Sequence, residues 1–200
     1  MLKLHYAPNT IAIASVVALN ETGHEYELVR VDFASGEQTK AAYHQVNPKG
    51  RVPALETEHG ILTETIAILE YIGPALVPDD PWRAAKMREM MTYIASTAHV
   101  NHAHKMRGHR WADREDSWAD MTAKVPETMA ASAAYIEANI AGPFLLGDDL
   151  SLADPYLYAV MLWLEGDGVT VSDFPKIGAF LDAMEARASV IKAREDGVIA

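Results

Sequence analysis

The chain has 200 residues, of which 50% are hydrophobic and 22% are charged, enough for two small domains with hydrophobic cores. Its net charge of −11 argues against a nucleic acid or an anionic membrane held by bulk electrostatics, although a small anionic ligand needs only local donors. The absence of cysteine excludes a disulfide framework, a thiolate zinc site and a protein thiol nucleophile.

The first half of the chain alternates segments typical of strands and of helices. Residues 2–6 and 27–33 alternate apolar and polar side chains, as a strand with one buried face does. The predicted elements, in chain order, are a strand at 2–6, a helix at 11–19, a strand at 27–33, a helix at 37–46, strands at 52–56 and 61–63, and a helix at 64–76. This order predicts a small mixed sheet with helices on its faces.

The apolar run from Ile11 to Leu19 is the one segment that imitates a targeting signal. A secretory signal has a basic region before its apolar core and small residues at a cleavage site after it, whereas here only Lys3 precedes the run. The run is also too short to cross a bilayer. We therefore expect a buried helix, with Thr10 as its N-cap, and a cytoplasmic location by default.

A segment with three prolines, residues 73–81, is the best candidate for a linker. The helices predicted after it span residues 83–111, 115–139, 152–165 and 174–187, with Pro126 as a kink or break in the second. The sequence therefore predicts an α/β domain with a mixed four-stranded sheet at 1–77 and an all-α bundle at 84–200.

Two strings near the middle of the first domain carry a resemblance to a known family. Asn47-Pro48-Lys49-Gly50-Arg51-Val52-Pro53-Ala54-Leu55 and the segment from Leu62 to Ile72 resemble the signature of glutathione transferases. Ser151-Leu152-Ala153-Asp154 resembles the capping box of a buried helix in that family's C-terminal domain, and its role is assigned to folding. The resemblance implies a thioredoxin-like fold for the first domain, and the beta class is the most similar bacterial group.

Val52 and Pro53 are the first residues that the resemblance places against glutathione. In the family the peptide before this proline is cis, and the backbone N–H and C=O of the residue at Val52 pair with the cysteinyl unit of glutathione. Proline cannot donate a ladder hydrogen bond, so a position at a strand start suits it. A trans proline that only ends a loop is the alternative, and it is the usual state of such bonds.

Glu64 and Thr65 begin a predicted helix and are expected to bind the γ-glutamyl end of glutathione. Helix N-terminal N–H groups and a hydroxyl suit a carboxylate, while a glutamate suits an ammonium group. A plain helix start is the alternative. The lysine that the beta class offers to the glycyl carboxylate has no counterpart here, and Lys49 or Arg51 is the candidate to replace it.

The catalytic position departs from the beta class. That class carries a cysteine at the start of the first helix, where this chain has Ile11. Other classes use a serine hydroxyl one position earlier, where this chain has Thr10, and a hydroxyl beside a helix N-terminus can stabilise a thiolate. We therefore expect Thr10 to lower the pKa of the bound thiol, with Tyr6 at the end of the first strand as the competing donor.

Four histidines in one predicted helix suggest a metal site, but their spacing disfavours one. His109 lies seven residues beyond His102, about 10 Å along a helix axis, and no nearby carboxylate completes a site with His99 and His102. His104 points to another side of the helix. We therefore expect no metal and a polar face that is solvated or lines a cleft.

The resemblance places one of these histidines in a substrate pocket. Ser96-Thr97-Ala98-His99 matches the stretch where beta-class proteins place a histidine in the electrophile pocket, although Val100 replaces the basic residue typical there. A core histidine is the alternative for His99. Met106 and Trp163 are further candidates for this pocket, but such side chains at helical spacing are often core.

Taken with the resemblance, these residues predict a homodimeric detoxification enzyme that conjugates glutathione to small hydrophobic electrophiles. Glutathione would be a co-substrate, with no nucleic acid or membrane as partner. One alternative is glutathione-dependent disulfide reduction with two bound glutathione molecules. The other is a binding or scaffold protein that keeps the fold without catalysis.

Overall fold

The computed structural model describes residues 1–200, which divide into two compact units. The first comprises Met1–Asp79 with Met184–Ala200, and the second comprises Asp80–Ala183. The predicted linker therefore contains the boundary. Residues 184–200, which were expected in the helical domain, belong instead to the first unit because α9 (Ala188–Glu195) packs against α1 (Ala12–Glu21).

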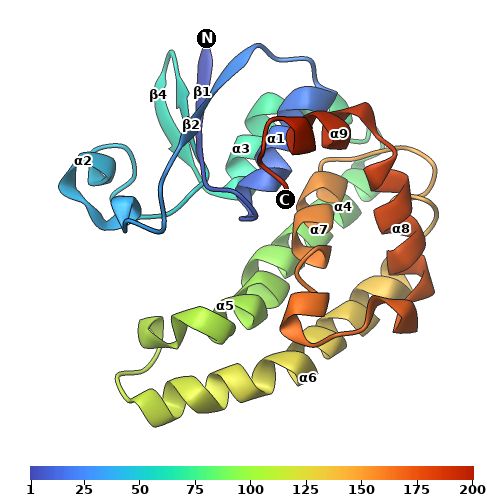
Figure 1. Ribbon diagram of the computed structural model, residues 1–200. Coiled ribbons are helices and arrows are strands. Elements are labelled where there is room, and N and C mark those ends of the chain that lie inside the picture. The colour runs from blue at the N-terminus through green and yellow to red at the C-terminus, as the bar shows by residue number, and fades with distance from the viewer. The chain divides into compact units, whose positions relative to one another are not determined.

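The first unit contains a mixed four-stranded sheet in the order β2-β1-β3-β4 (Figure 1). Its strands are β1 (Leu2–Tyr6), β2 (Tyr26–Arg30), β3 (Ala54–Thr57) and β4 (Gly60–Thr63). β1 is parallel to β2 and antiparallel to β3, which is antiparallel to β4. Leu4 pairs with Leu28 on one side and Leu55 on the other, so apolar side chains cross the sheet in register. The predicted mixed sheet with a thioredoxin-like order is confirmed.

Helices α1, α3 (Thr65–Ile72) and α9 lie together on one side of this sheet, with α2 (Ala41–His44) on the other (Figure 1). The predicted buried helix after β1 is confirmed, since every residue of α1 from Ala12 to Leu19 is buried. The helix predicted at 37–46 is shorter, and consists of a 3₁₀ turn followed by α2.

A charged contact fixes α9 against α1. Arg187 donates from Nε to Glu21 Oε1 at 2.5 Å and from Nη2 to Oε2 at 2.7 Å, and the Ser189 hydroxyl also donates to Oε1. Burial raises the pKa of Glu21, but the bonds from Arg187 and Ser189 outweigh burial, so the pKa of this carboxyl lies below its usual value. The carboxylate is therefore ionised at neutral pH and ties the segment after Met184 to the first unit.

The second unit is helical, as predicted. Its helices are α4 (Pro81–Tyr93), α5 (His99–Arg107), α6 (Glu115–Asn139), α7 (Ala153–Met161) and α8 (Pro175–Glu185), the last of which ends in the first unit. A π-helical turn at Ile94–Ala98 joins α4 to α5 within the predicted segment 83–111. None of the helices combines the length and the apolar composition that crossing a membrane requires.

Two sequence features of the helical unit have clear structural outcomes. Pro126 lies inside α6, which continues through it as one helix rather than breaking there.

Asp154 accepts hydrogen bonds from the Ser151 N–H at 2.7 Å and the Ser151 hydroxyl at 2.8 Å, and from the Leu145 N–H at 2.7 Å. The buried carboxylate thus fixes the start of α7, a folding role as expected, although the serine donates to the aspartate instead of capping the helix.

Candidate functional site

The turn before β3 presents the backbone of Val52. The Val52–Pro53 peptide is cis, as the resemblance implied. The preceding carbonyl, that of Arg51, accepts hydrogen bonds from the Tyr43 hydroxyl at 2.8 Å and from Asn47 Nδ2 at 2.7 Å. The N–H and C=O of Val52 make no hydrogen bond within the chain. The turn therefore holds the Arg51 carbonyl firmly, and leaves the Val52 N–H of the same peptide unit and the Val52 carbonyl free to pair with an extended ligand.

The segment from Asn47 to Gly50 is shaped by one buried side chain. Asn47 is 1% exposed, and its Oδ1 accepts from the Lys49 N–H at 3.1 Å while its carbonyl accepts from the Gly50 N–H at 2.9 Å. Gly50 has a φ of 62°, and a Cβ there would meet the carbonyl oxygen of Gln38 at 2.8 Å. Only glycine fits this position, which explains the residue pattern of the turn.

Tyr43 contributes to this turn as a neutral hydroxyl. Burial, and secondarily the negative charge of Glu37, raises the pKa of Tyr43 to about 12. The phenol therefore keeps its proton throughout the neutral range, and its hydrogen bond to the Arg51 carbonyl persists there.

The start of α3 offers unsatisfied donors next to a charged side chain. Glu64 is the residue before the helix, has a φ of 75°, and its side chain makes no capping bond. The N–H groups at the helix start therefore have no side-chain partner, and Thr65, with a hydroxyl that makes no hydrogen bond, is buried beside them. A non-glycine residue at such a φ is strained, and strain of this kind concentrates at ligand sites.

The carboxylate of Glu64 is already paired in this structure. Lys49 Nζ lies 2.5 Å from Glu64 Oε1 and 2.7 Å from Thr63 Oγ1, with both charged side chains exposed. The structure therefore brings Lys49 to the Glu64 end of the site. Arg51 is exposed, and its guanidinium makes no ion pair.

Thr10 and Tyr6 lie at the start of α1 and the end of β1. The Thr10 hydroxyl donates to the Ala7 carbonyl at 2.7 Å and accepts from the Ala12 N–H at 3.4 Å. The helix begins at Ala12 with Ile11 as its N-cap, one residue later than predicted. The Thr10 hydroxyl still accepts from the Ala12 N–H, as a capping side chain does, and it also donates back to the preceding loop. The N–H of Ile11 and the hydroxyl of the buried Tyr6 make no hydrogen bond.

The loop that carries Thr10 is held by the end of the described chain. Asn9 has a φ of 57°, donates from its N–H to the Val198 carbonyl at 3.0 Å, and accepts at Oδ1 from the Ala200 N–H at 2.9 Å. Asparagine tolerates this left-handed conformation better than most residues. The segment 184–200 therefore fixes the loop before α1.

In the second unit, two of the three electrophile-pocket candidates are in contact. The rings of His99 and Trp163 lie 5.2 Å apart between centroids. Met106 is on the same α5 face as His99 by helical spacing but is 71% exposed. The ring of His102, between them, stacks on Trp163 with centroids 4.0 Å apart and an interplanar angle of 20°.

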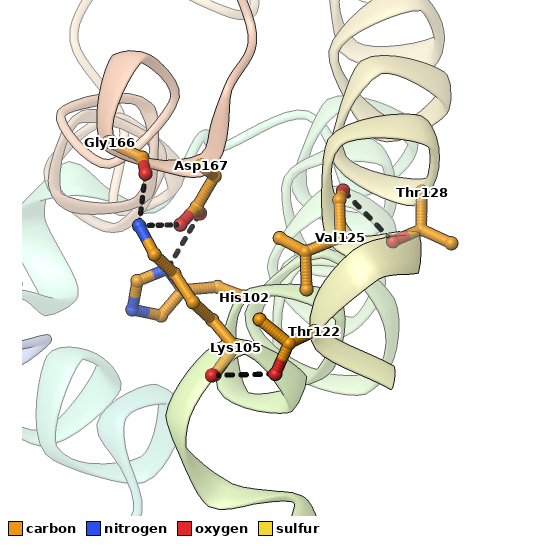
Figure 2. A network of polar contacts seen from close by, with 7 residues as sticks. All are labelled: His102, Lys105, Thr122, Val125, Thr128, Gly166 and Asp167. Carbon is orange, nitrogen blue, oxygen red and sulfur yellow. Dashed lines mark hydrogen bonds and ion pairs between the residues drawn. The ribbon is translucent and has the colours of Figure 1, made fainter. Parts of the chain in front are cut away.

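A carboxylate that the sequence did not reveal lies beside His102. Asp167 Oδ2 lies 2.7 Å from His102 Nδ1 although 65 residues separate the two in sequence (Figure 2). His104 and His109 pack edge-on against Trp111 and Trp118. No group of three or more histidine, cysteine, aspartate and glutamate side chains has the geometry to hold a metal ion.

Several residues of these sites were missed by sequence reasoning. Tyr43 and Asn47 had a local signal, because both precede the Val-Pro pair by a few residues and asparagine is typical of turns. No comparable local signal marked Asn9, His102 and Asp167, because their hydrogen-bond partners are distant in sequence.

Comparisons with known proteins match both units. Residues 1–73 match the family model of the glutathione S-transferase N-terminal domain, and residues 88–188 match that of the C-terminal domain. A glutathione S-transferase of Pseudomonas putida is 34% identical over an alignment of 203 positions, which spans 92% of this chain and 87% of that protein.

Solved structures of glutathione transferases are also similar to this chain. A glutathione transferase homologue from Sulfitobacter, with bound glutathione, is 54% identical, with a TM-score of 0.97 and coverage of 99% of both chains. A beta-class glutathione S-transferase from Sphingomonas chungbukensis is 26% identical, with a TM-score of 0.83 and coverage of 98% of this chain and 99% of that one. The resemblance to the beta class is confirmed, in a chain without cysteine.

Proposed function

The chain belongs to the glutathione S-transferase family, and we propose that it conjugates the thiolate of glutathione to small hydrophobic electrophiles. The observation that carries the proposal is the backbone of Val52, which is unpaired on a turn held by Tyr43 and Asn47. A tripeptide with an extended cysteinyl unit fits such an edge as a short antiparallel strand. The Sulfitobacter homologue holds glutathione.

The ends of glutathione have complementary groups on the same unit. The γ-glutamyl carboxylate would take the free N–H groups at the start of α3 and the Thr65 hydroxyl. The γ-glutamyl ammonium would bind Glu64 in place of Lys49, which an exposed ion pair holds by only about 0–1 kcal/mol. Arg51 remains the candidate for the glycyl carboxylate, since Lys49 lies at the opposite end of the proposed ligand.

The thiol would be activated at the start of α1. Thr10 can turn its hydroxyl from the Ala7 carbonyl to the sulfur, and the free N–H of Ile11 adds a second donor. Both donors and the helix N-terminus favour the thiolate over the thiol. Tyr6 is the competing donor.

The electrophile would lie on the helical unit against His99 and Trp163, with Met106 at an exposed position farther along α5. Aromatic and thioether side chains suit a flat apolar molecule. Conjugation of such molecules is the detoxification activity predicted from the sequence.

The proposal is tested by retention on immobilised glutathione and by conjugation of 1-chloro-2,4-dinitrobenzene. We expect elution by free glutathione and a rate above the uncatalysed reaction. Thr65→Val should weaken retention. Thr57→Val should not, because Thr57 is at the end of β3 that is far from the Val52–Pro53 turn. A protein that is retained and reduces a glutathione mixed disulfide, but does not conjugate the chlorobenzene, would be a disulfide reductase instead of a conjugating enzyme. If the protein is not retained and has neither activity, the remaining alternative is a scaffold protein without catalysis.

A further inference from the structure

The loop between β1 and α1, residues 7–10, is held by a part of the first unit that is distant in sequence. The Asn9 N–H donates to the Val198 carbonyl at 3.0 Å, and Asn9 Oδ1 accepts from the Ala200 N–H at 2.9 Å, across 191 residues of sequence. Asn9 is thus held by its backbone and its side chain together, at a φ of 57°. A non-glycine residue keeps such a conformation only where its surroundings impose it.

The segment that holds Asn9 is itself fixed on the first unit. Val198 and Ile199 are buried, and the N–H groups of both donate to the Ala193 carbonyl near the end of α9. α9 packs beside α1 (Figure 1). We call residues 196–200 the anchor segment, because they connect α9 to the loop before α1.

Arg194 fixes the last residue of the anchor segment. Its Nε and Nη2 donate to the carboxylate of Glu185 at 2.9 Å and 2.6 Å, and its Nη1 donates to the Ala200 carbonyl at 2.8 Å. Because a planar guanidinium held at two nitrogens by one carboxylate has a set orientation, its third donor has a set direction. Ala200 is therefore held at its carbonyl by Arg194 and at its N–H by Asn9.

Thr10 is the residue after Asn9, so the same contacts determine where its hydroxyl lies. Oγ1 donates to the Ala7 carbonyl at 2.7 Å and accepts from the Ala12 N–H at 3.4 Å. If the loop stays in place, the hydroxyl needs only to turn from the Ala7 carbonyl to reach a sulfur beside α1. If the loop shifts, the bond to the sulfur is lost, because a hydrogen bond weakens steeply when its geometry departs from the optimum.

The contacts of Asn9 also stabilise the folded unit, and a purely structural role is the alternative. Val198 and Ile199 bury their side chains and bond to α9 without Asn9, so the anchor segment does not need this contact to stay in place. What the contact fixes is the loop, at a strained residue next to the proposed activating hydroxyl. Backbone strain of this kind concentrates at functional sites.

We propose that Asn9 is a positioning residue for the formation of the glutathione thiolate, and that the anchor segment holds it in place. This role rests on the proposed function, because Asn9 acts through Thr10 and touches no substrate. The Val52 turn and the start of α3, which would bind the rest of glutathione, lie outside the loop. Loosening the loop should therefore impair ionisation of the thiol and leave the affinity for the protonated tripeptide unchanged.

The discriminating variants are Asn9→Gly and Arg194→Gln. Asn9→Gly accepts the left-handed backbone but removes the bond to Ala200, whereas Arg194→Gln releases the Ala200 carbonyl without a change in the loop itself. His24→Ala is the matched control, because it removes another long-range hydrogen bond of the first unit, the 2.7 Å contact of His24 Nε2 with the Ile72 carbonyl.

Three quantities are measured for each protein. The thiol pKa of bound glutathione is followed by ultraviolet absorbance, and the free energy of unfolding is measured in urea. The Kd of glutathione is measured by calorimetric titration at about pH 5.5, where the bound thiol is protonated and its ionisation does not contribute to affinity.

We expect Asn9→Gly and Arg194→Gln each to raise the thiol pKa by about 0.4–1.1 units, the equivalent of one hydrogen bond, and to leave the Kd within about twofold. His24→Ala should lower stability and leave the thiol pKa unchanged. An unchanged thiol pKa in both test variants, or an equal rise in His24→Ala, would overturn the proposal. Arg194→Gln carries the test alone if Asn9→Gly does not fold.

Failure of the proposed function has a different signature. In that case the unaltered protein does not bind glutathione, or it leaves the bound thiol near the free value of about 8.5, and the role of Asn9 fails with it. A wild-type thiol pKa that is lowered, and that rises in Thr10→Ala but not in Asn9→Gly or Arg194→Gln, would retain the proposed function and overturn the role of Asn9.

Discussion

The ammonium group of Lys49 lies 2.5 Å from the carboxylate of Glu64, so two residues expected at opposite ends of the ligand are partners in this structure. The pair is exposed, which limits its contribution to stability to about 0–1 kcal/mol. A ligand ammonium with a charge-assisted bond to Glu64 gains about 1.5–3 kcal/mol and can displace the lysine.

Glu64→Gln should therefore weaken glutathione binding by roughly 10- to 100-fold and leave the free energy of unfolding within about 1 kcal/mol. Lys49→Gln removes the ammonium that competes for Glu64 but leaves the carboxylate, so affinity should be unchanged or slightly higher. Calorimetric titration of both variants is the measurement. Equal affinities in the two variants would remove Glu64 from the proposed site.

Asn9 should stabilise the loop before α1 through its backbone as well as its side chain. Asn9→Ala places a less tolerant residue at a φ of 57° and removes the bond to Ala200, for a loss of about 1.5–3.5 kcal/mol. Asn9→Gly tolerates the left-handed backbone but removes the side-chain bond to Ala200, and should lose roughly 1 kcal/mol. Urea unfolding of both variants is the measurement. Equal losses in the free energy of unfolding would show that asparagine does not stabilise the loop by tolerating the left-handed backbone.

Glu21 should make stability depend on pH in the acidic range. Its pKa is lowered in the folded chain, so its contribution is present above the unfolded value of about 4.5 and is lost as pH falls through the folded value. Glu21→Gln should lower the free energy of unfolding by about 1.5–3 kcal/mol at pH 7. The difference from wild type should shrink below pH 4. A difference that is the same at pH 7 and pH 3 would assign the loss to packing.

A homodimer remains the expected assembly. The resemblance to the family implies this assembly, and large side chains such as Trp82, 73% exposed, and Tyr71, 45% exposed, are at the surface of their units. Light scattering at micromolar concentration should give a mass of twice 21.9 kDa. A mass near that of one chain would reject this prediction.

Periodic and local signals were sufficient for most of the fold. The apolar run after Thr10 predicted a buried helix because no face of α1 from Ala12 to Leu19 meets water. The prolines at 73–81 marked the end of the first unit, because consecutive turn-forming residues interrupt both helix and strand. Alternation along residues 2–6 gave β1 with its bounds.

Long-range pairing accounts for what sequence reasoning missed. The packing of α9 on α1 depends on Glu21 and Arg187, which no pattern links across the chain. The pairing of His102 with Asp167 is equally invisible in the periodicity of α5. The local assignment of Thr10 as the N-cap was off by one residue, and the sequence did not show that its hydroxyl, which accepts from the Ala12 N–H, also donates to the Ala7 carbonyl.

We propose that Thr10 turns bound glutathione into a thiolate. A free thiol titrates near 8.5, and lowering its pKa by two units requires about 2.7 kcal/mol of differential stabilisation. The Thr10 hydroxyl gains about 1.5–3 kcal/mol from a charged sulfur but gives up its neutral bond to Ala7, about 0.5–1.5 kcal/mol. The helix start adds about 0.3–1 kcal/mol, so a shift of about one to two units is expected.

The measurement is the ultraviolet thiolate absorbance of bound glutathione as a function of pH in wild type, Thr10→Ala, Thr10→Ser and Tyr6→Phe. The free energy of unfolding of each protein is measured as well. We expect a thiol pKa of about 6.5–7.5 in wild type. This pKa should persist in Thr10→Ser and Tyr6→Phe and should return toward that of the free thiol in Thr10→Ala. An unchanged pKa in Thr10→Ala together with a raised pKa in Tyr6→Phe would rule out activation by Thr10 and make the tyrosine the activating residue.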